Sequence, residues 1–144
     1  MKVYTIGFTK TKAKDFFSRL IKAGVKKVVD VRLNNVSQLA GFSKKDDLAY
    51  FLNEICGIDY EHRSELAPTK DMLDEYKKYR GDWTIYKERF LELMAQRKIE
   101  ETLPHSALDR ACLLCSEDKP HHCHRRLVAE YLKDKWNDLE ITHL

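Results

Sequence analysis

The chain is poor in glycine and proline and has no long apolar run. Its 144 residues include five glycines and three prolines, and 34% of them are charged, so the composition excludes a disordered or low-complexity chain. No stretch approaches the roughly 18 apolar residues of a membrane-spanning helix, and the opening residues MKVYTIGFTK have too few apolar residues for a signal peptide. We therefore expect a globular, cytoplasmic protein without a membrane partner.

Length, charge and cysteine content indicate the number of domains, the kind of surface and the state of the cysteines. A chain of this length predicts one domain, residues 1–144, whose core needs no metal or disulfide in order to fold. The net charge of +3 is dispersed, and cations are concentrated only in segment 119–126, so a broad basic face is not indicated. In the cytoplasm, the four cysteines are expected to be thiols or ligands rather than a disulfide framework.

Apolar periodicity predicts that strands and helices alternate along the chain. Strands are expected at 2–7, 26–32, 58–63, 110–115 and 139–144. Helices are expected at 12–24, at 43–57 with a capping box of Ser43 and Asp46, after the caps Thr69 and Asp82, and at 120–136 with Pro120 in the first position. This order predicts an α/β three-layer sandwich with a mainly parallel central sheet of about four to five strands.

Polar residues follow the predicted strands, where parallel sheets bind ligands. In open parallel sheets, ligands bind beyond the carboxyl ends of the strands. The segments expected there are Gly7 to Thr9, Asp30 with Arg32, Glu61 to Arg63, and Cys115 to Glu117. The start of the last helix reaches the same edge. We therefore expect five separate segments to meet on one rim.

The last predicted helix has an apolar stripe that orients its first residues. The stripe comprises Leu127, Val128, Tyr131 and Leu132. One turn earlier, Cys123 and His124 should point inward, toward the end of the strand that carries Cys115. Arg126 is expected beside the stripe, whereas Arg125 is expected to start on the outer side and to curl over the helix end.

The start of this helix is rich in cations, which is unfavourable for an isolated helix. Its first turns would hold His121, His122, His124, Arg125 and Arg126, each at a cost of about 0.3 to 1 kcal/mol when charged. Glu117 and Asp118 offset part of this cost, and an anion bound by free backbone N–H groups and a guanidinium would offset more. The alternative is a solvated surface, where such cations cost little.

The same segment contains donors for a metal and thiols for catalysis. Zinc could use Cys115, His121, His122, Cys123 and His124, but the C-x-x-C of Cys112 and Cys115 lies on a strand, where the two side chains face opposite sides. We therefore predict no metal and no cofactor. Cys115 or Cys123 could instead be a nucleophile, since a helix start and nearby cations favour the thiolate.

Four stretches of the chain form a recognisable signature. They are YTIGF (4–8), VVDVR (28–32), GIDYEHRSELAPT (57–69) and LLCSEDKPHHCHRRLVAEYL (113–132). Together they resemble the family catalogued as domain of unknown function 488. The resemblance implies a single compact α/β domain but no settled activity. The signature residues that it matches are Gly7, Asp30, Arg32, Tyr60, Cys115, Glu117, Pro120, Cys123, His124 and Arg125.

The chain departs from the family pattern at two places. Members often carry His and Ser after the first glycine, where this chain has Phe8 and Thr9. Members also carry a proline before the serine of the following loop, where this chain has Val36 before Ser37. The first departure removes a histidine that could have served as an acid or base.

Two classes of function fit these residues. The first is an enzyme acting on a phosphorylated or other anionic substrate, such as a nucleotide or a nucleic acid. Arg32 and Arg125 would clamp the anion, with Gly7, Tyr60, His124 and Arg126 also at the binding site. Glu117 or Asp30 would act as acid or base, and Cys115 or Cys123 as nucleophile.

The second class is a non-catalytic module that binds nucleic acid or another anionic ligand with the same cations, aided by the rim aromatics Tyr60 and Phe42. The carboxylates favour an enzyme, because a binding module has no need of them. Asp30 could equally pair with Arg32 or Arg125 and hold the loops. The sequence indicates no oligomeric state.

Overall fold

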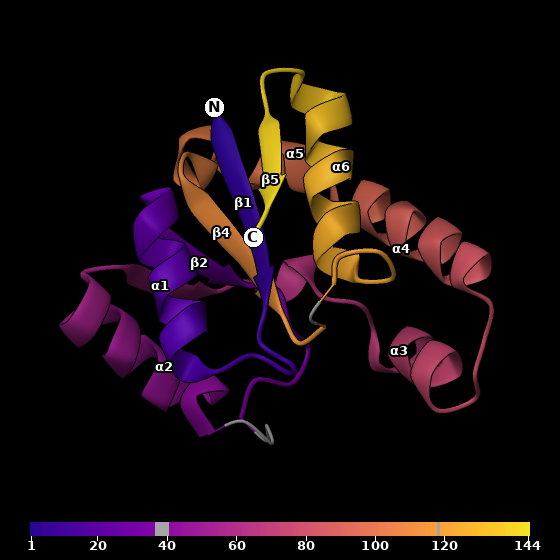
Figure 1. Ribbon diagram of the computed structural model, residues 1–144. Helices are drawn as coiled ribbons and strands as arrows, with labels where there is room; N and C mark the ends of the chain where they lie inside the picture. Colours follow the sequence, from indigo (N-terminus) through magenta and orange to yellow (C-terminus); the bar gives the residue numbers. More distant parts are fainter. Residues whose placement is uncertain (37–40, 118) are drawn as a thin grey trace.

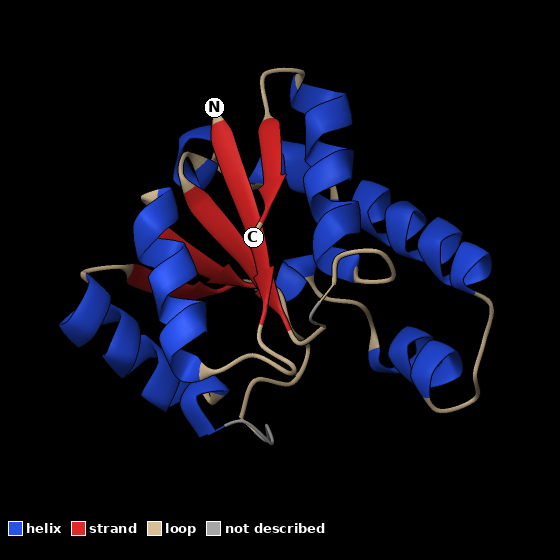
Figure 2. Ribbon diagram, in the orientation of Figure 1, coloured by secondary structure: helices blue, strands red, loops and turns tan. Residues whose placement is uncertain are grey.

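The computed structural model describes residues 1–36, 41–117 and 119–144, so Ser37 and Asp118, named above, lie outside the described residues. The described residues form a five-stranded sheet, in the order β3-β2-β4-β1-β5, in which all paired strands are parallel. Helices cover both faces of the sheet (Figures 1 and 2), which confirms the predicted α/β three-layer sandwich. The strands are β1 (Lys2–Gly7), β2 (Lys27–Asp30), β3 (Asp59–His62), β4 (Ala111–Cys115) and β5 (Glu140–His143).

The helices include the five predicted ones, in the predicted order, and one short helix that was not predicted. They are α1 (Ala13–Ala23), α2 (Lys45–Phe51), α3 (Lys70–Lys77), α4 (Trp83–Arg97), α5 (Ile99–Thr102) and α6 (His124–Trp136). A π-helical segment, Leu52–Cys56, continues α2, and short 3₁₀ segments occupy Gly41–Ser43, Ser64–Leu66 and His105–Leu108. No helix among the described residues is both long and apolar enough to cross a membrane.

Two apolar layers enclose the sheet, and the central strand β4 contributes to both. Cys112 and Leu114 pack with α1 and α2, whereas Leu113 and Cys115 pack with the helices of the other face, including α4 and α6. All five residues of β4 are buried, which explains its uninterrupted apolar sequence. Cys112 and Cys115 thus face opposite sides of the sheet, as their spacing predicted.

The predicted caps are confirmed for α3 and α4 and wrong for α2. The side chains of Thr69 and Asp82 accept hydrogen bonds from backbone N–H groups in the first turns of α3 and α4. Gly24 ends α1 with φ of 74°, a conformation that glycine adopts without steric cost. The predicted capping box at Ser43 is wrong, because α2 begins after Lys44, and Ser43 is buried within the preceding 3₁₀ segment.

The last helix begins later than its sequence predicts. We expected α6 to start at Pro120, but it starts at His124; Pro120 lies in a bend, and His121 and His122 form a turn. Cys123 precedes the helix in extended backbone, with φ of −134° and ψ of 137°. Its side chain is buried in the core, so tertiary packing overrides the local preference of proline for a first helical position.

Candidate functional site

A pocket of about 200 Å³ lies beyond the carboxyl ends of β2 and β4. Its wall also includes residues from α3, α4 and the first turn of α6. Five of the predicted site residues line it: Arg32, Cys115, Glu117, Cys123 and His124. The topology therefore brings together, at one edge of the sheet, side chains as far apart in sequence as Arg32 and His124, which are 92 positions apart.

Arg32 is held in the pocket wall by a buried ion pair. Its Nε donates to Asp30 Oδ1 at 2.9 Å, and its Nη2 donates to Asp30 Oδ2 at 2.7 Å. The guanidinium carbon Cζ of Arg32 lies over the ring of Phe8, 5.3 Å from the ring centroid. Asp30 is 0% exposed and Arg32 is 3% exposed. The bidentate contact fixes the plane of the guanidinium, and its third nitrogen, Nη1, has no hydrogen-bond partner among the described residues.

Asp30 is kept ionised by its neighbours. Burial alone would raise the pKa of the Asp30 carboxyl, but the hydrogen bonds and charge of Arg32 outweigh it and lower this pKa below its usual value. Tyr60 adds to this effect, because its hydroxyl donates to Asp30 Oδ2. Burial, followed by the hydrogen bond to Asp30, raises the pKa of Tyr60. Tyr60 therefore keeps its proton and supports the carboxylate behind Arg32.

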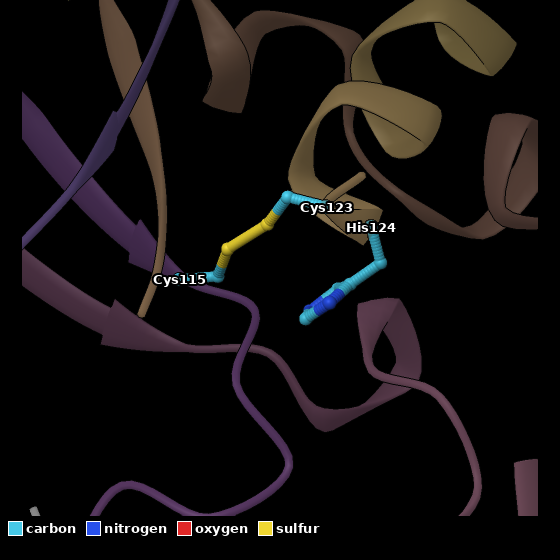
Figure 3. Close-up of side chains that lie close together, drawn as sticks. All are labelled: Cys115, Cys123 and His124. Atoms are coloured by element: carbon cyan, nitrogen blue, oxygen red, sulfur yellow. A yellow bond between two sulfur atoms is a disulfide. The ribbon is translucent and has the colours of Figure 1, made fainter. Parts of the chain in front are cut away.

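Cys115 and Cys123 are joined in a disulfide, which the sequence did not lead us to expect. It connects the end of β4 with the residue before α6 (Figure 3). Both cysteines are buried, at 1% and 3% exposure, and both border the pocket. Cys123 points inward, as the apolar stripe of α6 predicted. Cys56 and Cys112 carry free thiols.

Arg125 is buried behind the two sulfur atoms. Its Nη1 lies 3.3 Å from Cys115 Sγ and 3.6 Å from Cys123 Sγ, and also donates to the carbonyl of Glu117. The expectation that Arg125 starts on the outer side of the helix is wrong, since the residue is only 1% exposed. Ala129, one turn further along α6, is itself buried, so this helix face continues inward at Arg125.

Gly7 allows this arrangement by its lack of a side chain. A Cβ atom at Gly7 would overlap the backbone carbonyl of Glu117 and would lie 2.7 Å from Arg125 Nη1. The next loop is tied to the same segment, because the Thr9 N–H donates to the Ser116 carbonyl at 3.0 Å. Gly7 thus lets the end of β1 approach the loop after β4, outside the pocket wall itself.

His124 presents an imidazole to the pocket from the first position of α6. Its Nε2 lies 2.7 Å from the carbonyl oxygen of Val31, which can only accept, so Nε2 carries the hydrogen. Burial, together with the charges of Arg125 and Lys77, lowers the pKa of His124 to about 4 against the hydrogen bond to Val31. The ring is therefore neutral near pH 7, with Nδ1 as its basic nitrogen.

The sulfur atoms and the imidazole form a compact set of possible metal ligands. Ligand atoms of Cys115, Cys123 and His124 lie within 4.8 Å of one another (Figure 3). Two thiolates and an imidazole suit zinc. A metal needs both sulfur atoms as thiolates, however, and here they are bonded to each other.

The family model described as "Domain of unknown function DUF488" matches residues 12–132. The chain belongs to this family. The matched range contains every predicted site residue except Gly7. Neither the curated proteins nor the solved structures contain a match to the chain.

The DUF488 chain uses its signature residues in two adjoining groups. Asp30 and Tyr60 support Arg32 at the end of β2, and Gly7 and Arg125 support the disulfide and the loop after β4. Arg126 belongs to neither group, because its Nε donates to Glu130 at 2.9 Å and its Nη1 donates to the His121 carbonyl at 3.0 Å. It does not line the pocket.

The third strand contributes less to the rim than we expected. Arg63 pairs with Glu61 at 2.6 Å and with Glu65 at 3.1 Å, and none of the three lines the pocket. His62 reaches the edge of the site, with Nε2 2.9 Å from the Arg32 carbonyl. Of the five segments placed on the rim, the one after β3 therefore supports Arg32 rather than forming the wall.

Helices α3 and α4 contribute pocket residues that sequence reasoning missed. Tyr76 and Lys77 at the end of α3, and Tyr86 in α4, line the pocket, as does His122. His122 stacks on Trp83 of α4, with ring centroids 4.8 Å apart. Tyr76 and Tyr86 lie among the apolar residues whose spacing predicts these two helices. Leucine would suffice for packing at these positions, so the tyrosine hydroxyl groups are the feature of the sequence that could have indicated a place in the pocket.

Glu117 is the accessible carboxylate of the site. Its side chain is 40% exposed, lines the pocket and forms an ion pair with Lys77. Its backbone carbonyl is meanwhile fixed by Arg125. The carboxylate of Glu117 can thus move between Lys77 and a bound molecule, whereas Asp30 is enclosed by Arg32 and Tyr60.

Proposed function

We propose that the protein is an enzyme that acts on a small anionic substrate, such as a nucleotide or another phosphorylated molecule, bound in the pocket beside Arg32. The observation that carries this proposal is the buried guanidinium of Arg32. Asp30 engages Nε and Nη2, and Nη1 has no acceptor among the described residues. A buried donor without an acceptor costs about 1 to 3 kcal/mol, and an anionic oxygen would relieve that cost.

The surroundings of Arg32 support an anion of limited size. Lys77 lines the same pocket and can turn from the exposed Glu117 carboxylate to a ligand. The volume of about 200 Å³ suits a small molecule better than a strand of nucleic acid.

The aromatic residues expected to stack on bases are engaged elsewhere. Tyr60 donates to Asp30, and Phe42 packs against Phe16 and Phe17. These contacts favour a small substrate over a nucleic-acid-binding module.

The proposed reaction uses residues on the pocket wall. Glu117 is the candidate acid or base, because it is the carboxylate with access to a bound molecule. Cys115 or Cys123 is the candidate nucleophile once the disulfide is reduced. Asp30 orients Arg32 rather than transferring a proton, since Arg32 and Tyr60 engage both of its oxygens.

The proposal is tested by calorimetric titration of the reduced protein with inorganic phosphate and with nucleoside monophosphates. Arg32→Lys keeps a cation beside Asp30 but removes Nη1, which has no hydrogen-bond partner among the described residues, so we expect a loss of affinity of about tenfold or more. Lys77→Gln should weaken binding as well, by a few-fold. Arg126→Gln is the matched control, since Arg126 is a nearby cation outside the pocket, and it should bind like the wild type.

Turnover is tested separately, with the same compounds as substrates. Glu117→Gln should abolish product formation while leaving binding in place, because the side chain keeps its shape and loses its ionisable group. Anion binding that is unaffected by Arg32→Lys would overturn the assignment of the site. Binding without turnover of any of these compounds would favour the non-catalytic module.

A further inference from the structure

We infer that Cys115 and Cys123 are a redox-active pair that undergoes thiol–disulfide exchange with low-molecular-weight thiols and disulfides. This inference is independent of the proposed anion binding, because it requires only that a small thiol, reacting as its thiolate, reach the pocket. It assigns to the pocket a second class of reactant.

Access is the first requirement for exchange, and the pocket supplies it. Both cysteines are nearly inaccessible as whole residues, yet both form part of the wall of the open pocket. Cys112, by comparison, lies on the opposite face of β4 within the core under α1 and α2. A small thiol can therefore meet the Cys115–Cys123 bond without unfolding of the sheet.

Stabilisation of the released thiolate is the second requirement, and Arg125 provides it. One guanidinium nitrogen, Nη1, lies 3.3 Å from Cys115 Sγ and 3.6 Å from Cys123 Sγ. Whichever sulfur leaves during exchange therefore carries its negative charge beside the same N–H group. Cys123 also precedes the 13-residue helix α6, whose positive end favours a thiolate.

The exchange balances without any cofactor. An external thiolate attacks one sulfur and forms a mixed disulfide, while the electron pair of the broken bond passes to the other sulfur, which becomes a thiolate beside Arg125. A second external thiolate attacks the outer sulfur of the mixed disulfide and releases the remaining cysteine. The sum is protein disulfide plus two thiols giving protein dithiol plus one small disulfide, and it runs in reverse when the small disulfide is in excess.

The reduced form has a distinct consequence for the site. It presents two sulfur nucleophiles next to the neutral imidazole of His124. A ring nitrogen of His124 and the two Sγ atoms all lie within 4.8 Å of one another. The disulfide form has no free thiolate in the pocket. The redox state of the pair therefore determines whether cysteine chemistry is available there.

The experiment equilibrates the folded 144-residue chain with graded ratios of reduced and oxidised dithiothreitol. Samples are quenched with acid and alkylated after unfolding, and the number of alkylated cysteines is determined by mass spectrometry. We expect a reversible transition from two alkylated cysteines, Cys56 and Cys112, to all four. Peptide mapping should place the two additional labels on Cys115 and Cys123.

Five variants test the mechanism, three at cysteines and two at Arg125. Cys115→Ser and Cys123→Ser should each abolish the transition, and Cys56→Ser should leave the Cys115–Cys123 transition unchanged. Arg125→Met should slow the reduction of the disulfide roughly tenfold at neutral pH, since it removes a charge-assisted hydrogen bond to the leaving sulfur. Arg125→Lys restores the charge and should recover part of the rate, and circular dichroism checks that both variants fold.

Three results would overturn the inference. One is alkylation of all four cysteines even in oxidised dithiothreitol, which means that the disulfide does not form in solution. Another is a disulfide that excess reduced dithiothreitol cannot open in the folded protein. The third is a fully reduced protein that binds one equivalent of zinc and oxidises only after chelation, which would assign the cluster to a metal.

Discussion

At the residue scale, the site depends on two arginine side chains that are buried and hydrogen-bonded, Arg32 and Arg125. Arg32 and Arg125 are both nearly inaccessible, and each is directed by a specific acceptor, a carboxylate for Arg32 and a backbone carbonyl for Arg125. Burying a cation is costly unless such partners are present. The two guanidinium groups therefore mark the positions where the fold places positive charge next to the pocket and next to the sulfur atoms.

Gly7 gives a prediction at this scale. Gly7→Ala should destabilise the protein by about 2 kcal/mol or more, because its Cβ would overlap the Glu117 carbonyl that accepts from Arg125. Urea unfolding measures the effect. Gly41→Ala is the matched control, since no atom of the described residues lies within 4 Å of an added Cβ there, and it should stay within about 0.5 kcal/mol of the wild type. Equal stability of the two variants would contradict the close approach of β1 to the loop after β4.

At the scale of elements, helices α3 and α4 determine the wall of the pocket opposite the sheet. Each begins with the cap that its sequence predicts, and α3 carries Tyr76 and Lys77 at its end. The start of α6 differs from the prediction. Cys123 is buried in the core in extended backbone, so the helix begins only at His124. A helix end is therefore predictable where only local contacts act on it, as at Thr69, and is not predictable where a distant partner competes.

The cap of α3 gives a prediction at this scale. Thr69→Ala should cost about 1 kcal/mol of stability, because it removes the hydroxyl that accepts from the Met72 N–H at 3.2 Å. We expect weaker phosphate binding as well, since Lys77 lies on the same short helix. Thr11→Ala, at an exposed loop hydroxyl, should change neither quantity. Unchanged urea unfolding of Thr69→Ala would show that the cap does not hold α3.

At the scale of the whole molecule, pH acts on stability through the partly buried side chain of His124. Burial lowers the pKa of His124 to about 4, so the folded protein does not take up a proton at His124 as readily as the unfolded chain, whose value is 6.5. The stabilising contribution is present above pH 6.5 and is lost as the pH falls toward 4. Asp30 acts in the same direction but only at lower pH, because its pKa lies below its usual value of 3.8.

The corresponding prediction concerns the free energy of unfolding. The wild type should lose about 1 to 2 kcal/mol between pH 7 and pH 5, and His124→Gln should show a smaller loss. Some dependence should remain in the variant, since burial also lowers the pKa of His143. Urea unfolding at several pH values supplies the measurement. An identical pH dependence in both proteins would place the titrating group elsewhere.

The sequence by itself determined the α/β class, the order of elements and the inward direction of Cys123, because these depend on apolar periodicity and parallel strand connections. It also selected Arg32, Cys115, Glu117 and His124 as neighbours, since each lies at or after the end of a predicted strand or near the start of the last predicted helix, at one sheet edge. Only the tertiary structure decided the strand order, the inward position of Arg125, the late start of α6 and the entry of Tyr76, Lys77 and Tyr86 into the pocket. Those features depend on contacts between segments far apart in the chain, whose packing overrides local preference and leaves no periodic signal in the sequence.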